Sequence, residues 1–294
     1  MIRIGVSLRS AYGIDDPRVG ARWMIERAAA ARAADLDSLF VGDHHVTGAP
    51  YYQNVPILGR LLAEWGDKPA GALFLLPLWS PVLVAEQVGT LASIAGGRFI
   101  IQCALGAGRR QFEAMGADVR KRPSTFERNL EIIRMLVAGG DVDGARVAPI
   151  PTEPVEVWIG GSAPPAIDRA ARLGDGFLAG PNLTMGEAAA ELDLYRERCA
   201  AHGRAVGVAA IRRDIHVGAD AADARRVAQP VLDAGYRGFP PDAAVVGGPA
   251  EVASVFRDLH GLGYTDVIVR HLADEHAEVI AALHRLADVR SLLG

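Results

Sequence analysis

The chain has 294 residues, a formal net charge of −4 at pH 7 and a hydrophobic fraction of 50%. This length suits one α/β barrel with insertions, and the charge gives no reason to expect a nucleic acid or an anionic membrane as a partner. Cys103 and Cys199 lie in unrelated contexts, which is typical of a reducing compartment without disulfides. The N-terminal apolar run is too short for a signal sequence, and no run reaches the roughly 18 residues of a membrane span. We therefore expect a cytoplasmic protein.

Short apolar runs alternate with segments of helical periodicity along the whole chain. Buried strands are expected at residues 2–8, 36–42, 72–76, 98–105, 155–159, 176–179, 208–217 and 265–269. Helices are expected at 19–34, 57–65, 82–95, 124–137, 166–173, 187–202, 221–227, 249–262 and 274–293. A hydroxyl and an acid three residues apart, Ser124 and Glu127, predict a capping box at the start of one helix.

Strands that alternate with helices predict a parallel sheet, and eight such units favour closure into a (β/α)8 TIM barrel. We expect one domain over residues 1–294, with the irregular stretch 229–248 after the seventh strand as an insertion or lid. Residues 141–154, rich in Gly, Pro and Asp, are the most plausible break but are too short for a domain linker. The loop 47–55, rich in Gly, Pro, Tyr and Asn, is expected to lie over a site.

The second strand ends in three titratable residues, Asp43, His44 and His45. Barrel enzymes carry their chemistry where strands end. Histidine titrates near neutral pH, and a neighbouring carboxylate can fix its tautomer. These residues therefore indicate a proton-handling cluster, although a polar loop in which one histidine caps a helix is the alternative. No further ligand motif accompanies the adjacent histidines, so no metal site is expected.

Two glycine-rich turns follow strands four and five. Gly160, Gly161 and Ser162 open a helix, where free backbone N–H groups favour a phosphate. Gly106, Ala107 and Gly108 would let a flat ligand approach the backbone. Ordinary strand-to-helix turns are the alternative for both. Strand seven carries four polar or charged residues, Arg212, Arg213, Asp214 and His216. They could belong to a functional site or pair with one another inside the fold, and the sequence leaves both interpretations open. Serine-hydrolase, P-loop and Rossmann motifs are absent.

The order and spacing of these motifs resemble the bacterial luciferase-like monooxygenases, a superfamily of barrels that use FMN or the deazaflavin F420. The most specific stretch is Trp-Ile-Gly-Gly-Ser at 158–162 together with 169–176. The other matching stretches are 41–45, 81–88, 96–99, 106–108, 112–116, 122–136, 248–252 and 263–266.

The resemblance implies a flavin-type ring at the C-terminal face of the barrel, with Asp43 and His44 near its reactive edge. It also implies a non-prolyl cis peptide bond after strand three, within residues 75–79. The cofactor-binding positions that it implies are Leu76, Pro77, Gly106, Ala107, Gly108, Arg122, Gly160, Gly161 and Ser162.

The resulting hypothesis is a monooxygenase that uses reduced FMN and dioxygen on a small organic substrate. His44 would give or take a proton, Asp43 would orient it, and His45 or His271 would assist. The alternatives are F420-dependent hydride transfer, a flavin-binding barrel without turnover and a metal-dependent barrel hydrolase. The Asp-His-His sequence at strand two combines features of the FMN and the F420 enzymes. Expected partners are a flavin or F420 reductase and a second copy of the chain, paired through the apolar helix 57–65.

Overall fold

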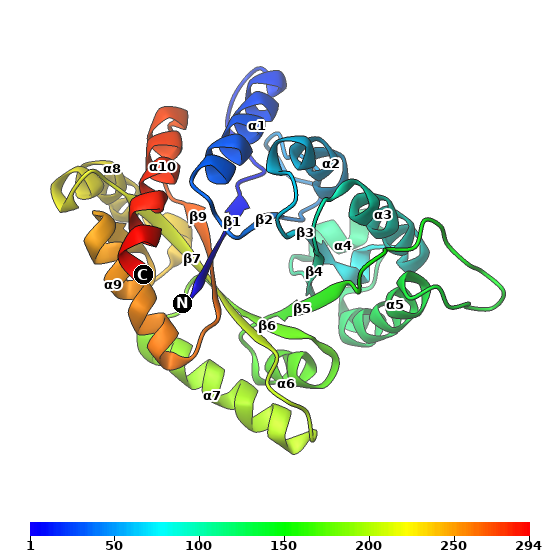
Figure 1. The fold of residues 1–294 in the computed structure, drawn as a ribbon. Coiled ribbons are helices and arrows are strands. Elements are labelled where there is room, and N and C mark those ends of the chain that lie inside the picture. Colours follow the sequence, from blue (N-terminus) through cyan, green and yellow to red (C-terminus); the bar gives the residue numbers. More distant parts are fainter.

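The computed structural model describes residues 1–294. Its strands are β1 (Arg3–Leu8), β2 (Ser38–Val41), β3 (Ala70–Leu75), β4 (Phe99–Ala104), β5 (Glu156–Gly160), β6 (Gly176–Ala179), β7 (Val208–Val217), β8 (Val245–Gly247) and β9 (Asp266–His271). All neighbouring strands are parallel, and β9 pairs with both β7 and β1, which closes an eight-stranded ring (Figure 1). The predicted TIM barrel is confirmed.

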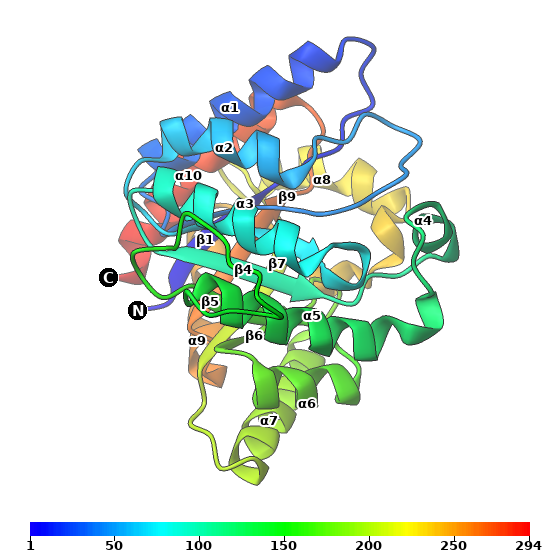
Figure 2. The same ribbon diagram turned by 90° about the vertical axis from the view of Figure 1, so that its right-hand side faces the viewer.

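The helices surround the barrel (Figure 1). They are α1 (Pro17–Ala33), α2 (Asn54–Trp65), α3 (Pro81–Ile94), α4 (Arg109–Ala114), α5 (Arg122–Val137), α6 (Pro164–Leu173), α7 (Met185–Ala201), α8 (Ala221–Asp233), α9 (Pro249–Leu262) and α10 (His276–Leu293). In the side view of Figure 2 both termini lie at one end of the barrel, and α4 lies toward the other. None of the helices has the length and unbroken apolar character needed to cross a bilayer.

The stretch 229–248 is more ordered than its composition predicts. Helix α8 continues through Pro230 to Asp233, and residues 245–247 form the extra strand β8, which pairs with residues 215–217 of β7. The prediction of an irregular segment is therefore wrong at both ends. A proline inside a helix removes one hydrogen bond but does not always end it, and a three-residue strand is too short to show a period.

The capping box predicted at Ser124 is also wrong. Helix α5 begins two residues earlier at Arg122, so the Ser124 hydroxyl lies inside the first turn and donates to the Lys121 carbonyl at 3.0 Å. The chain has its capping box at α7 instead, where Thr184 and Glu187 bond to each other's backbone N–H groups. The same Ser/Thr-x-x-Glu pattern occurs at both places, and only the second coincides with a helix start.

The barrel interior is filled by large side chains from non-neighbouring strands. The rings of Phe40 on β2 and Trp158 on β5 lie 5.5 Å apart, although two strands separate them in the sheet. They therefore meet across the inside of the ring, together with Ile100, Ala210 and Ile268. This layer closes the interior and confines any cavity to the ends of the barrel.

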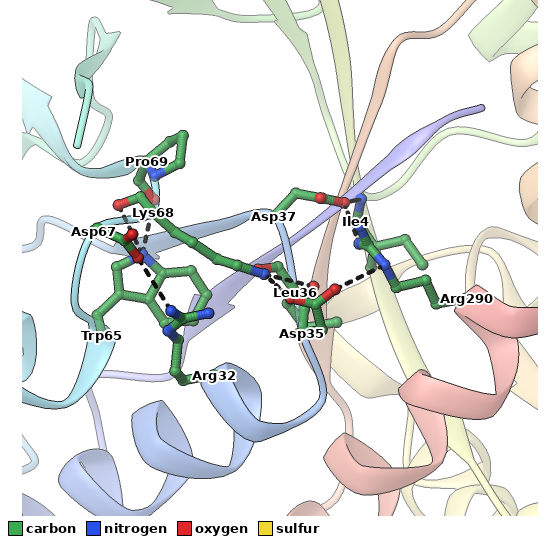
Figure 3. Close-up of polar contacts among 10 residues, drawn as sticks. All are labelled: Ile4, Arg32, Asp35, Leu36, Asp37, Trp65, Asp67, Lys68, Pro69 and Arg290. Carbon is green, nitrogen blue, oxygen red and sulfur yellow. Dashed lines mark hydrogen bonds and ion pairs between the residues drawn. The ribbon is translucent and has the colours of Figure 1, made fainter. Parts of the chain in front are cut away.

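Charged side chains close the end at which the strands begin (Figure 3). The Asp37 carboxylate accepts from the Ile4 N–H and from Arg290, both at 2.7 Å, which ties β1 to α10. Lys68 donates to the Leu36 carbonyl at 2.8 Å and also pairs with Asp35. These contacts join β1 and α10 to the loops that precede β2 and β3, at the end where barrels carry stability rather than chemistry.

Candidate active site

A cavity of about 410 Å³ opens at the end where the strands stop. Its wall comes from the ends of β1, β2 and β9, from Leu73 within β3, from Arg212 within β7 and from two loops. Tyr51 from the loop 47–55 is part of this wall, as is Arg237 from the stretch 229–248. The volume falls in the range of about 300–1,000 Å³ that is usual for small-molecule sites.

Asp43 connects the end of β2 to the segment after β3. Its side chain has no exposed surface, and its Oδ2 accepts from the Leu75 N–H and from Trp79 Nε1, each at 2.8 Å. A buried carboxylate with two donors is held in one orientation. Asp43 therefore fixes the backbone and the indole that border the region of the implied ring.

The two adjacent histidines point in different directions. His45 is nearly buried; its Nε2 lies 3.2 Å from Asp43 Oδ1, and its ring packs 5.6 Å from that of Trp79. His44 is exposed and lines the cavity, with its ring 6.0 Å from that of Tyr51. No hydrogen bond or ion pair joins His44 to Asp43, so the acid contacts the other histidine of the pair.

Leu76 and Pro77 lie in a buried 3₁₀ turn, η1 (Leu76–Leu78), directly after β3. Asn129 of α5 donates from its Nδ2 to the carbonyls of Leu76 at 2.9 Å and Trp79 at 3.0 Å. Asn129 was not among the residues predicted from the sequence, because only the fold brings α5 beneath this turn. The single cis peptide bond of the chain is Ala148–Pro149, so the expected cis bond within residues 75–79 is wrong.

Gly106, Ala107 and Gly108 connect β4 to α4, with positive φ angles of 72° at Gly106 and 89° at Gly108. Arg122, at the start of α5, donates from Nη1 to the Gly106 carbonyl at 3.3 Å. The structure thus brings two of the predicted cofactor contacts together, the glycine turn and this arginine.

Gly160, Gly161 and Ser162 connect β5 to α6 at the same rim. Gly161 has φ 151°, the exposed Ser162 follows it, and no side chain caps the N-terminus of α6. Beside this turn, burial raises the pKa of Glu191 to about 7, and the Ser162 hydroxyl opposes that shift only in part. None of the three turn residues lines the cavity, because β5 lies across the eight-stranded ring from β1.

Arginines dominate the cavity wall. Arg212 and Asp214 are two residues apart on β7, and their side chains meet at 3.0 Å. Arg237 donates to Asp214 at 2.8 Å, and Arg270 of β9 also lines the cavity. Burial and the nearby Arg270 and Arg237 lower the pKa of Arg212 to about 10, although Asp214 opposes the shift. Residues two apart on a strand point to the same face of the sheet, so the spacing of Arg212 and Asp214 in the sequence already indicated that their side chains share a face.

His271 lies outside the cavity wall. Its ring is buried, neither ring nitrogen has a hydrogen-bond partner, and burial together with the neighbouring His216 lowers its pKa to about 3. Nowhere in residues 1–294 do three or more His, Cys, Asp or Glu side chains gather as metal ligands would.

Residues 3–252 match the sequence profile of a family described as luciferase-like monooxygenase. The chain belongs to this family. It is 32% identical over 190 residues, 58% of its length, to an F420-dependent glucose-6-phosphate dehydrogenase of Beutenbergia cavernae, of which the match covers 56%. It is 29% identical over 216 residues, 69% of its length, to an FMNH2-dependent dimethylsulfone monooxygenase of Pseudomonas fluorescens, of which the match covers 58%.

Matches to curated relatives span between 39% and 61% of those relatives' lengths. Among solved structures, the oxygenating constituent of 3,6-diketocamphane monooxygenase from Pseudomonas putida, in complex with FMN, superposes with a TM-score of 0.81. The two chains are 14% identical, and the match covers 98% of this chain and 97% of that one. At this identity the likeness shows the fold alone. The expected family is confirmed, and its curated relatives include proteins named as F420-dependent and FMNH2-dependent enzymes.

Proposed function

We propose that this protein binds reduced FMN at the C-terminal rim of its barrel and uses it with dioxygen to oxygenate a small organic molecule. The observation that carries the proposal is the buried Asp43, which fixes Leu75 and Trp79 beside a cavity that His44 lines. A binding site alone does not need a buried carboxylate and an exposed imidazole at one strand end.

The residues around the rim suit a phosphorylated planar ring. Glycines with positive φ leave room beside the β4 turn. Helix α6 begins with Pro164 and Pro165, so it offers the phosphate its positive dipole end, while the free N–H donors are those of Gly161 and Ser162, which make no backbone hydrogen bond. Arg122 adds a cation beside the β4 turn. Reduced FMN would supply the electrons that activate dioxygen. The chain itself would position the ring, exclude water and move a proton at the His44 imidazole.

F420-dependent hydride transfer is the second candidate. It is favoured by the Asp43–His44 order at strand two, which resembles the F420 enzymes, and by the F420-dependent relative. Equilibrium dialysis of the purified protein against an equimolar mixture of FMN and F420, with the bound fraction identified by absorbance, decides between the two. Retention of FMN supports the proposal, retention of F420 alone replaces it with the alternative, and retention of neither removes both.

The role of His44 is tested by reduction of the bound cofactor followed by mixing with dioxygen. His44→Ala is expected to slow reoxidation by roughly 10²–10⁴-fold, the usual contribution of a general acid or base, while cofactor affinity is unchanged. His284→Ala on the exposed face of α10 is the matched control. An unchanged reoxidation rate in His44→Ala would remove this role and favour a flavin-binding barrel without turnover.

A flavin reductase as electron donor and a second copy of the chain are further parts of the proposal. The apolar residues of α2, including Leu58, Leu61 and Trp65, are buried against the rest of the chain. A homodimer through this helix would therefore use its polar face. Sedimentation at several protein concentrations measures that association, and a monomer at all of them would exclude it.

A further inference from the structure

Four arginines from four separate segments converge on the cavity. Arg9 follows β1, Arg212 lies on β7, Arg237 on the turn η3 (Tyr236–Gly238), and Arg270 on β9. Like charges repel one another, so a fold does not collect four cations at one cavity unless anions accompany them.

The anions that the chain supplies are too few. Asp274 pairs with Arg9, and Asp214 serves both Arg212 and Arg237. Arg270 makes no hydrogen bond and no ion pair, and its Nε is buried without a partner. Asp43 is the one acid of the cavity wall itself, and its carboxylate already accepts from Leu75 and Trp79. The cavity therefore keeps a positive excess centred on Arg270.

The backbone conformation of Arg237 itself is also unusual. Arg237 has φ 52°, in the left-handed region that residues other than glycine rarely adopt. Its guanidinium is nevertheless fixed, 2.8 Å from Asp214 and 4.5 Å from the centre of the Phe239 ring. Strain of this kind persists where the surrounding structure imposes it, often at ligand sites.

We propose that this cavity binds the anionic end of the substrate, a carboxylate, sulfonate or phosphate group, with Arg270 as its principal contact and Arg212 beside it. A guanidinium matches the two oxygens of such a group with two parallel hydrogen bonds. His44 lines the same cavity, so an anion held here leaves the remainder of the molecule near the imidazole. The assignment of the anion to a substrate rests on the proposed function.

The cofactor phosphate is the other possible source of an anion, and the structure offers it a different place. Gly160, Gly161, Ser162 and Arg122 do not line this cavity. Comparison of FMN with riboflavin, which lacks the phosphate, therefore separates the two sources.

The test compares acids with their neutral amides on the purified full chain: acetate with acetamide, benzoate with benzamide, and octanoate with octanamide, each by isothermal titration at low salt. At least one acid is expected to bind tenfold or more tightly than its amide, and added salt should weaken this preference. Arg270→Gln should reduce the preference to about twofold or less, and Arg270→Lys should leave an intermediate value. Arg22→Gln is the matched control, because Arg22 is exposed on α1 and also unpaired.

Equal binding of every acid and its amide by the unaltered protein would overturn the inference. An Arg270→Gln variant that loses affinity for FMN but not for riboflavin would also overturn it, since the arginines would then hold the cofactor phosphate. Because acids are titrated without turnover, an acid preference in a protein that binds neither FMN nor F420 would support the anion site while removing the proposed function.

Discussion

Replacement of Asp43 by alanine is the sharpest perturbation that the candidate site offers. The carboxylate has no exposed surface, and a single oxygen accepts from both the Leu75 N–H and Trp79 Nε1. Alanine leaves both donors without a partner. Leu75 is itself buried, so water cannot readily replace the lost oxygen at its N–H.

The magnitude follows from these two bonds. Hydrogen bonds to a charged group contribute about 1.5–3 kcal/mol each, and an unsatisfied buried donor costs about 1–3 kcal/mol. Relief of the buried charge offsets part of this loss. We therefore expect Asp43→Ala to lower the free energy of unfolding by about 3 kcal/mol, which at about 2–4 °C per kcal/mol corresponds to a fall in Tm of roughly 6–12 °C. Asp43→Asn keeps one accepting oxygen and should cost about 1 kcal/mol.

Thermal unfolding of both variants by circular dichroism at pH 7 measures these shifts. Asp15→Ala is the control, because Asp15 is exposed and makes no hydrogen bond or ion pair. A Tm for Asp43→Ala within about 1 °C of the control would refute the argument, since it would mean that the two contacts contribute no net stability.

Three further changes test other parts of the structure. Burial lowers the pKa of His271 to about 3, so below about pH 6.5 the unfolded chain binds a proton at this residue that the native state does not bind. The free energy of unfolding should therefore fall as the pH drops below 6.5. His271→Leu should flatten the dependence of Tm on pH between pH 6.5 and 4.5. Glu191, with a pKa raised to about 7, acts in the opposite direction, so Glu191→Gln should raise the Tm at pH 8 by more than at pH 5. In α3, a Cβ on Gly89 would lie 2.1 Å from the Pro149 carbonyl, whereas in α2 a Cβ on Gly59 meets nothing closer than 3.8 Å. Gly89→Ala should therefore destabilise the protein by more than about 2 kcal/mol, and Gly59→Ala should stabilise it by up to about 1 kcal/mol. Urea titration measures both changes in the free energy of unfolding. Changes of the same sign in the two variants would contradict the clash at Gly89.

The barrel could be predicted because its strands are buried on both faces and so appear in the sequence as apolar runs. Elements that depend on tertiary contacts could not. The strand β8 has three residues and exists only because β7 extends beyond β6, which pairs with it no further than Ile211 and leaves that edge free at residues 215–217. The start of α5 at Arg122 similarly follows a 3₁₀ turn that the Ser124 pattern does not reveal.

Some residues of the candidate site could likewise be predicted from the sequence, and those that depend on tertiary contacts could not. Asp43 could be found because an acid directly after an apolar run marks a strand end. Which histidine it contacts could not be known, since the direction of each side chain depends on the loop that carries it. Arg237 comes from a segment without periodicity, and Asn129 approaches from a helix 50 residues or more further along the chain than the carbonyls it bonds. Sequence order therefore identifies residues at the strand ends and misses those that reach them from elsewhere.

The two ends of the barrel differ in how completely their charges are paired, and this difference has a physical meaning. Where the strands begin, Lys68 and Arg290 each contact an aspartate, as does Arg32 (Figure 3). Such contacts hold neighbouring elements together and leave nothing to offer a ligand. Where the strands end, Arg270 is unpaired and His44 is exposed, although both line a cavity. An unpaired cation beside an enclosed space lowers stability unless something else binds there. At this end the arginine is therefore free to bind a ligand, whereas at the opposite end the charged side chains are already paired within the chain.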